Sequence, residues 1–251
     1  MYLLISDILK KFLFKKGFYK KSKFDKSFIS GALSILISQK KGRLLEIIQI
    51  GANDGLTTDY LNDCLKIFGN YISILFVEPQ VNLKEKLIAN TSSIAKKTAY
   101  QFVAIAPDNK KNMKLYLPKG DKIPFASQLA SFKKEQIIKR FRKYTNIKEP
   151  IINKHFYALN VPTITLSDLS RVWKNKNNIN KICDVLIIDA EGFDDEVIYS
   201  INPKDKWPAL ISLEWKNLTD SKLKKLEKFL LDKGYFTFKW SKADLAAVKF
   251  D

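Results

Sequence analysis

The sequence has few of the residues that form disulfides or zinc sites. Its 251 residues include two cysteines, Cys64 and Cys183, and one histidine, His155. Both cysteines lie in apolar segments without a CxxC pair, so we expect buried, reduced thiols and a reducing cytoplasmic location. A chain of this length buries about 70–75% of its unfolded surface without such cross-links. It suits one α/β domain with an appendage.

Long apolar runs and negative charge are also scarce. No stretch reaches the roughly 18 uncharged apolar residues of a membrane-spanning helix. The start MYLLISDILKKF has no basic segment before its apolar residues, so we expect no cleaved signal peptide. Lys and Arg number 44 against 26 acids, a formal charge of +18. This charge favours nucleic acid, anionic lipid or acidic glycan as partners, or is a lysine-rich composition that solvates the surface.

Residues 1–42 are predicted to form a basic helical extension before a main domain at 43–251. Leu4, Ile8 and Phe12 recur at helical spacing, and a second helix is expected from about Ser27. Two alternatives follow from this pattern. Residues 1–26 either contact an anionic membrane surface as an amphipathic segment, which makes the protein peripheral to the membrane, or belong to a helical cap packed on the domain.

From Leu44 onward, apolar strands alternate with helices. This order predicts an α/β fold with a doubly wound, mostly parallel sheet and right-handed crossovers. The last two strands are expected to be antiparallel. The expected strands are 44–50, 72–78, 98–104, 112–117, 185–188, 209–215, 235–240 and 244–250; helices are expected at 56–68, 80–90, 165–174, 193–200 and 220–233.

An insertion at about 118–160 interrupts this alternation. It contains ASQLASF and a helix rich in cations, and insertions of this kind often cover an active site. Ser127 and Ser131 are candidates to contact an acceptor or cofactor from a lid, with an acidic acceptor meeting the cations at 139–143. A solvated helix face is the alternative. His155 is a candidate base or a structural residue.

The most informative motif is the turn Gly51-Ala52-Asn53-Asp54-Gly55, which follows an apolar strand. The next strand ends on Glu78. A strand, a glycine turn, a helix and an acid closing the next strand form a nucleotide cradle, in which the carboxylate accepts two ribose hydroxyls. Because ligands bind beyond the C-terminal ends of parallel strands, we expect the turn, Glu78, Asp189 with Glu191, and Glu214 to share one edge.

The turn also discriminates between cofactors. A dinucleotide site has the pattern G-x-G-x-x-G, whereas this turn carries Asn53 at the second glycine position and Asp54 within it. A carboxylate facing a pyrophosphate is repulsive. It suits a cofactor that has adenosine and an amino-acid moiety without phosphates, namely S-adenosylmethionine.

Several motifs together resemble the FkbM family of S-adenosylmethionine-dependent methyltransferases over about residues 44–250. The resemblance implies a class I methyltransferase (Rossmann-like) fold with a seven-stranded sheet, and O-methylation of sugar or natural-product hydroxyls. It also implies that Gly51, Asn53 and Gly55 line the methionine part, that Glu78 with Pro79 holds the ribose, and that Ala104 lies near the adenine. The motifs are GANDG at 51–55, VEP at 77–79, TITLSDL at 163–169, VLIIDAEGFD at 185–194 and ISLEW at 211–215.

By the same resemblance, Asp189 and Glu191 face the reaction centre. They are our candidates for the base that deprotonates an alcohol acceptor, and Glu214 is the candidate to orient it. The alternative is that Asp189 and Glu191 are acids favoured at a helix N-terminus. Mg²⁺ at these three acids is conceivable but not expected. Many family members carry lysine where this chain has Ile187, which leaves the acceptor open.

Beside O-methylation of a glycan or small metabolite, an NAD-dependent oxidoreductase is one alternative, and two further functions stay open. A nucleic-acid methyltransferase is suggested by the charge alone, but nucleic acid is not the expected partner because the sequence has no stacking motif or RNA-binding module. A non-catalytic protein that binds a membrane surface or glycan through residues 1–26 is the other. Trp215 either offers a face for sugar stacking or belongs to the core. The sequence makes no prediction of oligomeric state.

Overall fold

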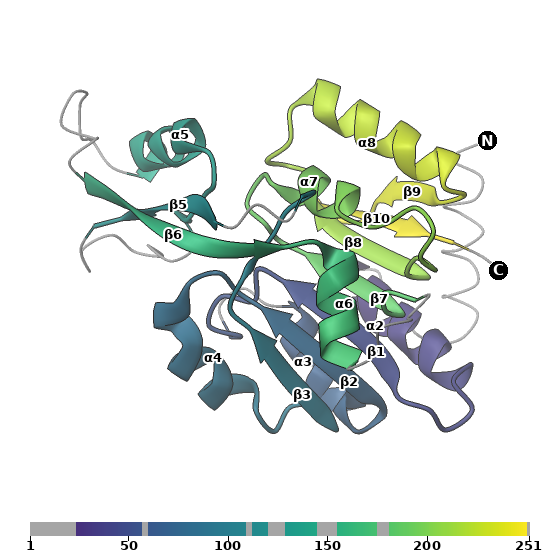
Figure 1. The fold of residues 1–251 in the computed structure, drawn as a ribbon. Helices are drawn as coiled ribbons and strands as arrows, with labels where there is room; N and C mark the ends of the chain where they lie inside the picture. The colour runs from purple at the N-terminus through teal and green to yellow at the C-terminus, as the bar shows by residue number, and fades with distance from the viewer. Residues whose placement is uncertain are drawn as a thin grey trace.

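The computed structural model describes residues 24–56, 60–108, 112–119, 129–144, 155–174 and 181–249. Within them, a seven-stranded sheet has the order β3-β2-β1-β7-β8-β10-β9 (Figure 1). All neighbours are parallel except β10, which runs antiparallel to both β8 and β9. This is the doubly wound, mostly parallel sheet that the sequence predicted, with the reversed strand of the class I methyltransferase fold. Its strands are β1 (Leu45–Ile50), β2 (Ile72–Val77), β3 (Lys97–Gln101), β7 (Val185–Ile188), β8 (Leu210–Glu214), β9 (Phe236–Lys239) and β10 (Asp244–Val248).

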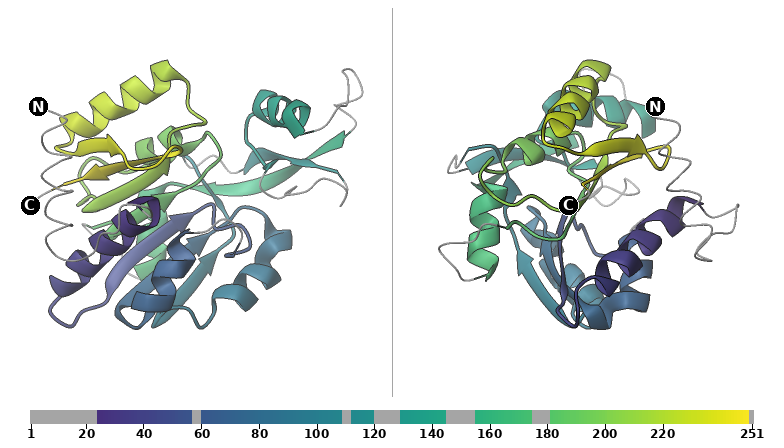
Figure 2. Two further views of the ribbon diagram at one scale, coloured as in Figure 1. Left: turned by 180° about the vertical axis from the view of Figure 1, so that it is seen from behind. Right: turned by 90° about the vertical axis from the view of Figure 1, so that its right-hand side faces the viewer.

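Helices cover both faces of this sheet (Figure 2). Alternate residues of each strand point to opposite faces, so Ile48 and Ile50 of β1 enter one core while Leu45 and Ile47 enter the other. One face packs against α6 (Leu166–Lys174), α7 (Asp194–Tyr199) and α8 (Asp220–Asp232). The other packs against α2 (Phe24–Ser38), α3 (Tyr60–Phe68) and α4 (Lys84–Thr91), with short 3-10 turns at Gly69–Tyr71 and Val81–Leu83.

A second, three-stranded sheet forms an arm beside the main body (Figure 1). Its order is β4-β6-β5, with β4 at Ala104–Ile105, β5 at Asn112–Pro118 and β6 at Phe156–Ile164. Helix α5 (Lys134–Tyr144) lies on it. The predicted strand at 112–117 is confirmed but belongs to this arm rather than to the main sheet.

Two expectations for this region were wrong in detail. The strand expected at 98–104 ends at Gln101, and the chain then leaves the main sheet to form β4, which pairs with Thr163 and Ile164 of β6. Strand β6 itself was not predicted. Most of its residues are exposed or half-buried on both faces, so its sequence lacks the apolar alternation that marks a core strand.

Helix α2 is the described part of the N-terminal extension. Its residues Phe28, Ile29 and Leu33 are buried in the same core as β1, and the Phe28 ring lies 5.1 Å from that of Phe238. For this helix the contacts match the helical cap rather than a membrane-surface segment. Residues 1–23 lie outside the described part, so the membrane contact proposed for 1–26 stays a prediction, as does the division at 42/43.

Two other expectations concern the chain as a whole. Cys64 and Cys183 are free and buried, as the sequence predicted. Burial also raises the pKa of the Cys183 thiol, so it stays protonated at neutral pH. Among the helices that the structure describes, none combines the length and the apolar character required to cross a bilayer.

Replacement of Leu33 by alanine tests whether α2 is part of the fold. Leu33 is fully buried, so we expect Leu33→Ala to lower the free energy of unfolding by about 2–5 kcal/mol in urea denaturation. Leu231→Ala is the matched control, because Leu231 is 53% exposed and its loss should change stability by less than about 0.5 kcal/mol. Equal effects of the two substitutions would contradict the packing of α2.

Candidate active site

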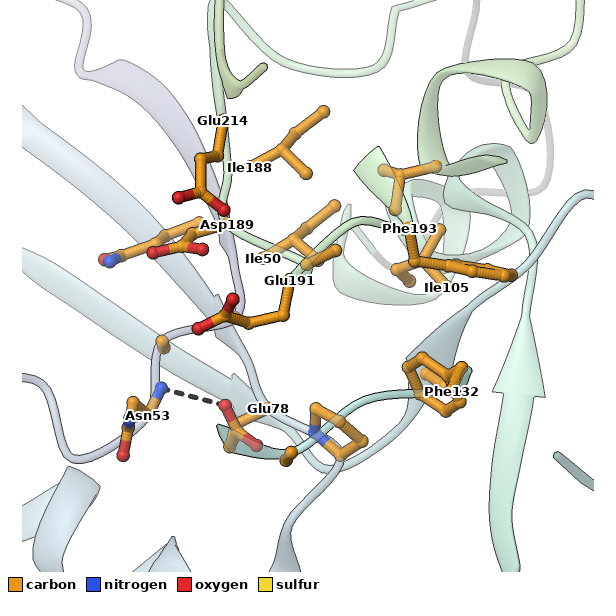
Figure 3. Close-up of a pocket in the computed structure, with 18 of the residues that line it drawn as sticks. Ile50, Asn53, Glu78, Ile105, Phe132, Ile188, Asp189, Glu191, Phe193 and Glu214 are labelled. Carbon is orange, nitrogen blue, oxygen red and sulfur yellow. Dashed lines mark hydrogen bonds between the residues drawn. The ribbon is translucent and has the colours of Figure 1, made fainter. Parts of the chain in front are cut away.

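A pocket of about 530 Å³ opens at the C-terminal edge of the main sheet. Its volume lies within the about 300–1,000 Å³ typical of small-molecule sites. Acidic side chains from the ends of β2, β7 and β8 line one side, and Ile105, Phe132 and Phe193 line the other (Figure 3). The predicted shared edge is therefore observed, since the turn after β1, Glu78, Asp189, Glu191 and Glu214 all contribute to one pocket.

The turn after β1 is pressed against the loop after β7. Gly51 has φ +78°, and a Cβ atom there would lie 1.9 Å from the carbonyl oxygen of Asp189. Only glycine fits such an approach. The amides of Gly51 and Ala52 donate to the Val77 carbonyl at 2.9 and 3.2 Å, which ties the turn to the end of β2.

Glu78 directly follows β2 and is buried, with 3% of the residue exposed. Its Oε2 accepts from the Asn53 amide at 2.8 Å and its Oε1 accepts from the Gln80 amide at 3.0 Å (Figure 3). Burial raises the pKa of this carboxyl, and the two hydrogen bonds oppose the rise. Asn53 adopts φ +49°, a left-handed conformation that Asn tolerates, and this aims its amide at Glu78.

Two residues of the turn lie elsewhere than the sequence suggested. Gly55 is not a lining residue; a Cβ there would meet Thr91 at 2.4 Å, so this glycine allows close packing on α4. Asp54 also lies outside the lining. Its Oδ1 accepts from the Leu56 amide at 3.0 Å within the turn, a frequent use of Asp in turns. The expectation that its carboxylate faces the ligand is therefore wrong.

Apolar residues complete the part of the pocket next to Glu78. Pro79 follows Glu78 directly, and Ala104 and Ile105 come from β4, where the chain has left the main sheet. Leu115 of β5 lines the same pocket. Apolar walls beside a buried carboxylate are compatible with an adenine ring joined to a ribose; the placement of Ala104 near the adenine and of Pro79 at the ribose stays a prediction.

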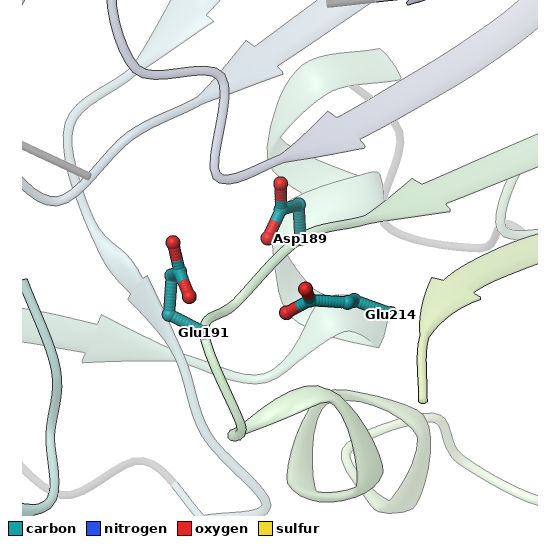
Figure 4. Close-up of side chains that lie close together, drawn as sticks. All are labelled: Asp189, Glu191 and Glu214. Carbon is teal, nitrogen blue, oxygen red and sulfur yellow. The ribbon is translucent and has the colours of Figure 1, made fainter. Parts of the chain in front are cut away.

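Three carboxylates gather on the other side of the pocket. One oxygen from each of Asp189, Glu191 and Glu214 lies within 4.8 Å of the others (Figure 4). Glu191 has φ +53°, a conformation rare for a side chain of its size and found mostly at functional sites. The spacing is short enough for a divalent ion, but a side-chain amide already donates to two of the three carboxylates, and we assign no metal to them.

That amide belongs to Asn217, a residue that sequence reasoning missed. Its Nδ2 donates to Glu191 Oε2 at 3.2 Å and makes a close contact with Glu214 Oε2. Asn217 stands three residues after Glu214 in LEWKN, and this spacing across a turn was the available signal. Asn217 does not itself line the pocket; among the residues that do, Gln49, Phe132, Lys216 and Asp244 were also missed.

Asp194, at the first turn of α7, anchors the loops that carry these acids. It is fully buried, and its carboxylate accepts from the amides of Ala190, Gly192 and Glu214 at 3.0–3.3 Å. Burial raises the pKa of Asp194 well above the usual value, and the charges of Asp189 and Glu214 add to the rise. Asp194 lies in the first turn of α7, where an acid is favourable. Its bonds also reach the end of β8.

The arm contacts the loop after β7. The Phe132 ring lies 5.2 Å from that of Phe193, and Lys133 Nζ donates to the Gly192 carbonyl at 2.9 Å. Ser131 lines the pocket as the sequence suggested, whereas Ser127 and the side chains of Arg140 and Lys143 lie outside the described part. The insertion thus contributes directly to the pocket wall.

Three residues that the sequence analysis singled out remain to be placed relative to the pocket: His155, Trp215 and Ile187. His155 does not line the pocket; its carbonyl accepts from the Lys119 amide in the arm. Trp215 also lies outside the lining, packs against the core and carries Lys239 Nζ 3.6 Å from its ring centroid. Ile187 is buried and lines the pocket floor where the sequence departs from the family pattern.

The buried state of Asp194 has a consequence for pH dependence. A carboxyl whose pKa is raised on folding binds a proton that the unfolded chain releases, so stability falls as pH rises from about 3.8 through its folded pKa. We expect urea unfolding at stepwise pH to show this fall, at up to about 1.4 kcal/mol per pH unit. Asp194→Asn should show a shallower slope, although the lost acceptor lowers stability at every pH. Parallel curves of stability against pH for the two proteins would contradict Asp194 as the cause of this fall.

Comparisons with known proteins give a family and distant structural neighbours. No curated protein matches the sequence. The fibrillarin pre-rRNA processing protein of Methanococcus jannaschii shares 12% identity over 82% of this chain and 67% of its own, with a TM-score of 0.38. An O-methyltransferase from Bacillus cereus, solved with SAH, shares 10% over 92% and 83%, with a TM-score of 0.42. The CurJ carbon methyltransferase shares 11% over 93% of this chain and 57% of its own, with a TM-score of 0.44.

The family assignment comes from the sequence model. The model of the methyltransferase FkbM domain matches residues 49–237, which is well over half of the chain. The match runs from β1 into β9 and includes every carboxylate of the pocket except Asp244. The chain therefore belongs to the FkbM family of S-adenosylmethionine-dependent methyltransferases.

Proposed function

We propose that the protein transfers the methyl group of S-adenosylmethionine to a hydroxyl oxygen of a sugar, a glycan or a small metabolite. The observation that carries this proposal is the division of one pocket into two halves. One half has the buried Glu78 beside apolar walls, and the other has the carboxylates of Asp189, Glu191 and Glu214. The first half suits the cofactor, and the second suits an acceptor that must lose a proton.

The residues of the first half fit the cofactor. Each Glu78 oxygen accepts one backbone amide, which holds the carboxylate in a fixed direction at the pocket and supports pairing with the two ribose hydroxyls. Gly51 and Asn53 lie at the turn where the methionine part would be held, and Ala104 with Pro79 would flank the adenine. When bound, S-adenosylmethionine supplies an electrophilic methyl group on a positively charged sulfur.

The residues of the second half fit the acceptor. Alignment of two bound reactants supplies about 7–11 kcal/mol of the barrier, and a positioned base contributes about 10²–10⁴-fold. We assign the base role to Glu191 or Asp189, which would accept the hydroxyl proton, and the orienting role to Glu214. Phe132 and Phe193 from the arm and the α7 loop would exclude water from the reacting oxygen.

The charge of the pocket supports a neutral acceptor. Glu78, Asp189, Glu191, Glu214 and Asp244 line it, while Lys216 is the cation among the described lining residues. A phosphate backbone would be repelled at this wall, so the pocket does not favour the nucleic-acid alternative. The cationic sulfur of the cofactor is attracted to the same wall. A polyhydroxylated, uncharged acceptor meets both conditions better than the acidic acceptor considered for the cations at 139–143.

The cofactor assignment is tested by calorimetry with Glu78→Gln. An amide offers one acceptor atom where the carboxylate offers two, so a buried hydrogen bond to a charged group, worth about 1.5–3 kcal/mol, is lost. We expect S-adenosylmethionine to bind the unaltered protein and the Kd to rise about 10–100-fold in Glu78→Gln. Glu85→Gln is the matched control, since Glu85 is exposed on α4, away from the pocket. An unchanged Kd in a folded Glu78→Gln protein would contradict the ribose contact.

The acceptor is tested by mass spectrometry of glycans and metabolites from cells with and without the gene. We expect a compound heavier by one CH₂ unit that disappears with the gene, with fragmentation placing the added methyl on oxygen. Restoring the gene as Glu78→Gln should not restore that compound. A methyl group on carbon, or on RNA, would overturn the O-methylation of a glycan or small metabolite.

A further inference from the structure

Asn217 occupies a fixed position between two loops of the pocket. It follows β8, where the amides of Trp215 and Lys216 donate to the Ala243 carbonyl at 2.9 and 3.3 Å. The Leu218 amide donates back to the Trp215 carbonyl at 3.0 Å and closes a turn. The backbone that carries Asn217 is therefore held from two sides.

The side chain of Asn217 joins acids from different strands. Its single Nδ2 donates to Glu191, on the loop after β7, and to Glu214, at the end of β8. An amide nitrogen has two hydrogens, so one can serve each carboxylate.

This arrangement has an electrostatic effect. Two carboxylates a few ångström apart repel each other, and the repulsion favours protonation of one of them. Hydrogen bonds donated to the charged forms oppose that protonation and fix the direction of each oxygen. The Asp194 side chain is already bonded to the backbone of both loops, through the amides of Ala190, Gly192 and Glu214.

We propose that Asn217 is a positioning residue, which holds Glu191 and Glu214 as an ionised pair directed at the methyl acceptor. This inference rests on the proposed function, since the pair acts on the acceptor hydroxyl. Asn217 itself does not line the pocket, so it acts through the two carboxylates rather than on the acceptor. Loss of the amide therefore leaves the cofactor half of the pocket intact.

The experiment is a carbon-13 NMR titration of the glutamate carboxyl groups in the whole protein. Glu191→Gln and Glu214→Gln assign the two signals. We expect Asn217→Ala to raise the titration midpoints of both by on the order of one pH unit, because the charged forms lose their donors. Asn217→Asp has nearly the same shape but adds a further negative charge beside Glu191, Glu214 and Asp189, so its midpoints should rise further. Asn217→Ser keeps one donor and should raise one midpoint only.

Two controls separate this role from a structural one. Asn90→Ala removes an amide that donates to the Asp54 carbonyl at 2.7 Å, so it should leave both midpoints unchanged. Affinity for S-adenosylhomocysteine, measured by calorimetry, should change by less than about 3-fold in every Asn217 variant that folds. This limit is on the order of 0.6 kcal/mol.

Unchanged midpoints in a folded Asn217→Ala or Asn217→Ser protein would overturn the proposal. So would a shift of the wild-type midpoints on addition of a chelator, because a bound cation would then compensate the pair. Neither result touches the cofactor assignment. Failure of the wild-type protein to bind S-adenosylhomocysteine would instead contradict the proposed function, whatever the titration shows.

Once an acceptor is identified, the pH profile of methyl transfer gives a second readout. The acid limb of the profile should move to higher pH in Asn217→Ala, and kcat should fall more than the KM for the cofactor changes. A lower kcat with an unmoved acid limb would indicate a structural role only, and would also overturn the proposal.

Discussion

The contact between Gly51 and the Asp189 carbonyl is the constraint on which the pocket depends. The main sheet places β1 and β7 side by side, and the Asp189 amide donates to the Ile50 carbonyl at 2.9 Å. The turn after β1 and the loop after β7 therefore begin side by side. They approach so closely that no side chain fits at Gly51. The groups assigned to cofactor and acceptor are thus held at a fixed separation by the backbone.

Two buried carboxylates organise the loops around this contact. Glu78 binds the amides of Asn53 and Gln80, and Asp194 binds the amides of three residues on two loops. In both cases, backbone donors at the end of a strand balance the cost of burial. The exposed or half-buried acids, in contrast, stay available to a ligand. The buried acids thus hold the loops of the pocket in place, whereas the exposed and half-buried acids can contact a bound ligand.

The sequence predicted most of the main sheet, because its strands are buried on both faces and read as continuous apolar runs such as Val185–Ile188. It also located Glu78 and the loop acids, since parallel strands bring their C-terminal ends to one edge. It missed β6, whose residues are mostly exposed or half-buried and which contains Pro162. It misplaced Asp54 and passed over Asn217, because the direction of a side chain on a turn depends on tertiary contacts rather than on spacing. Asp54, from which we inferred S-adenosylmethionine, therefore does not line the pocket.

The arm has a consequence for how this scaffold diversifies. Glu78, Asp189 and Glu214 lie at or just beyond the ends of main-sheet strands, whereas Ala104, Leu115 and Phe132 come from a separate small sheet and its connections. The arm contacts the body through a few points, among them the bond from Lys133 to Gly192. Mutations there can reshape the outer wall without disturbing the central sheet. The wall that the arm contributes can therefore change while the carboxylates at the ends of the main-sheet strands keep their positions.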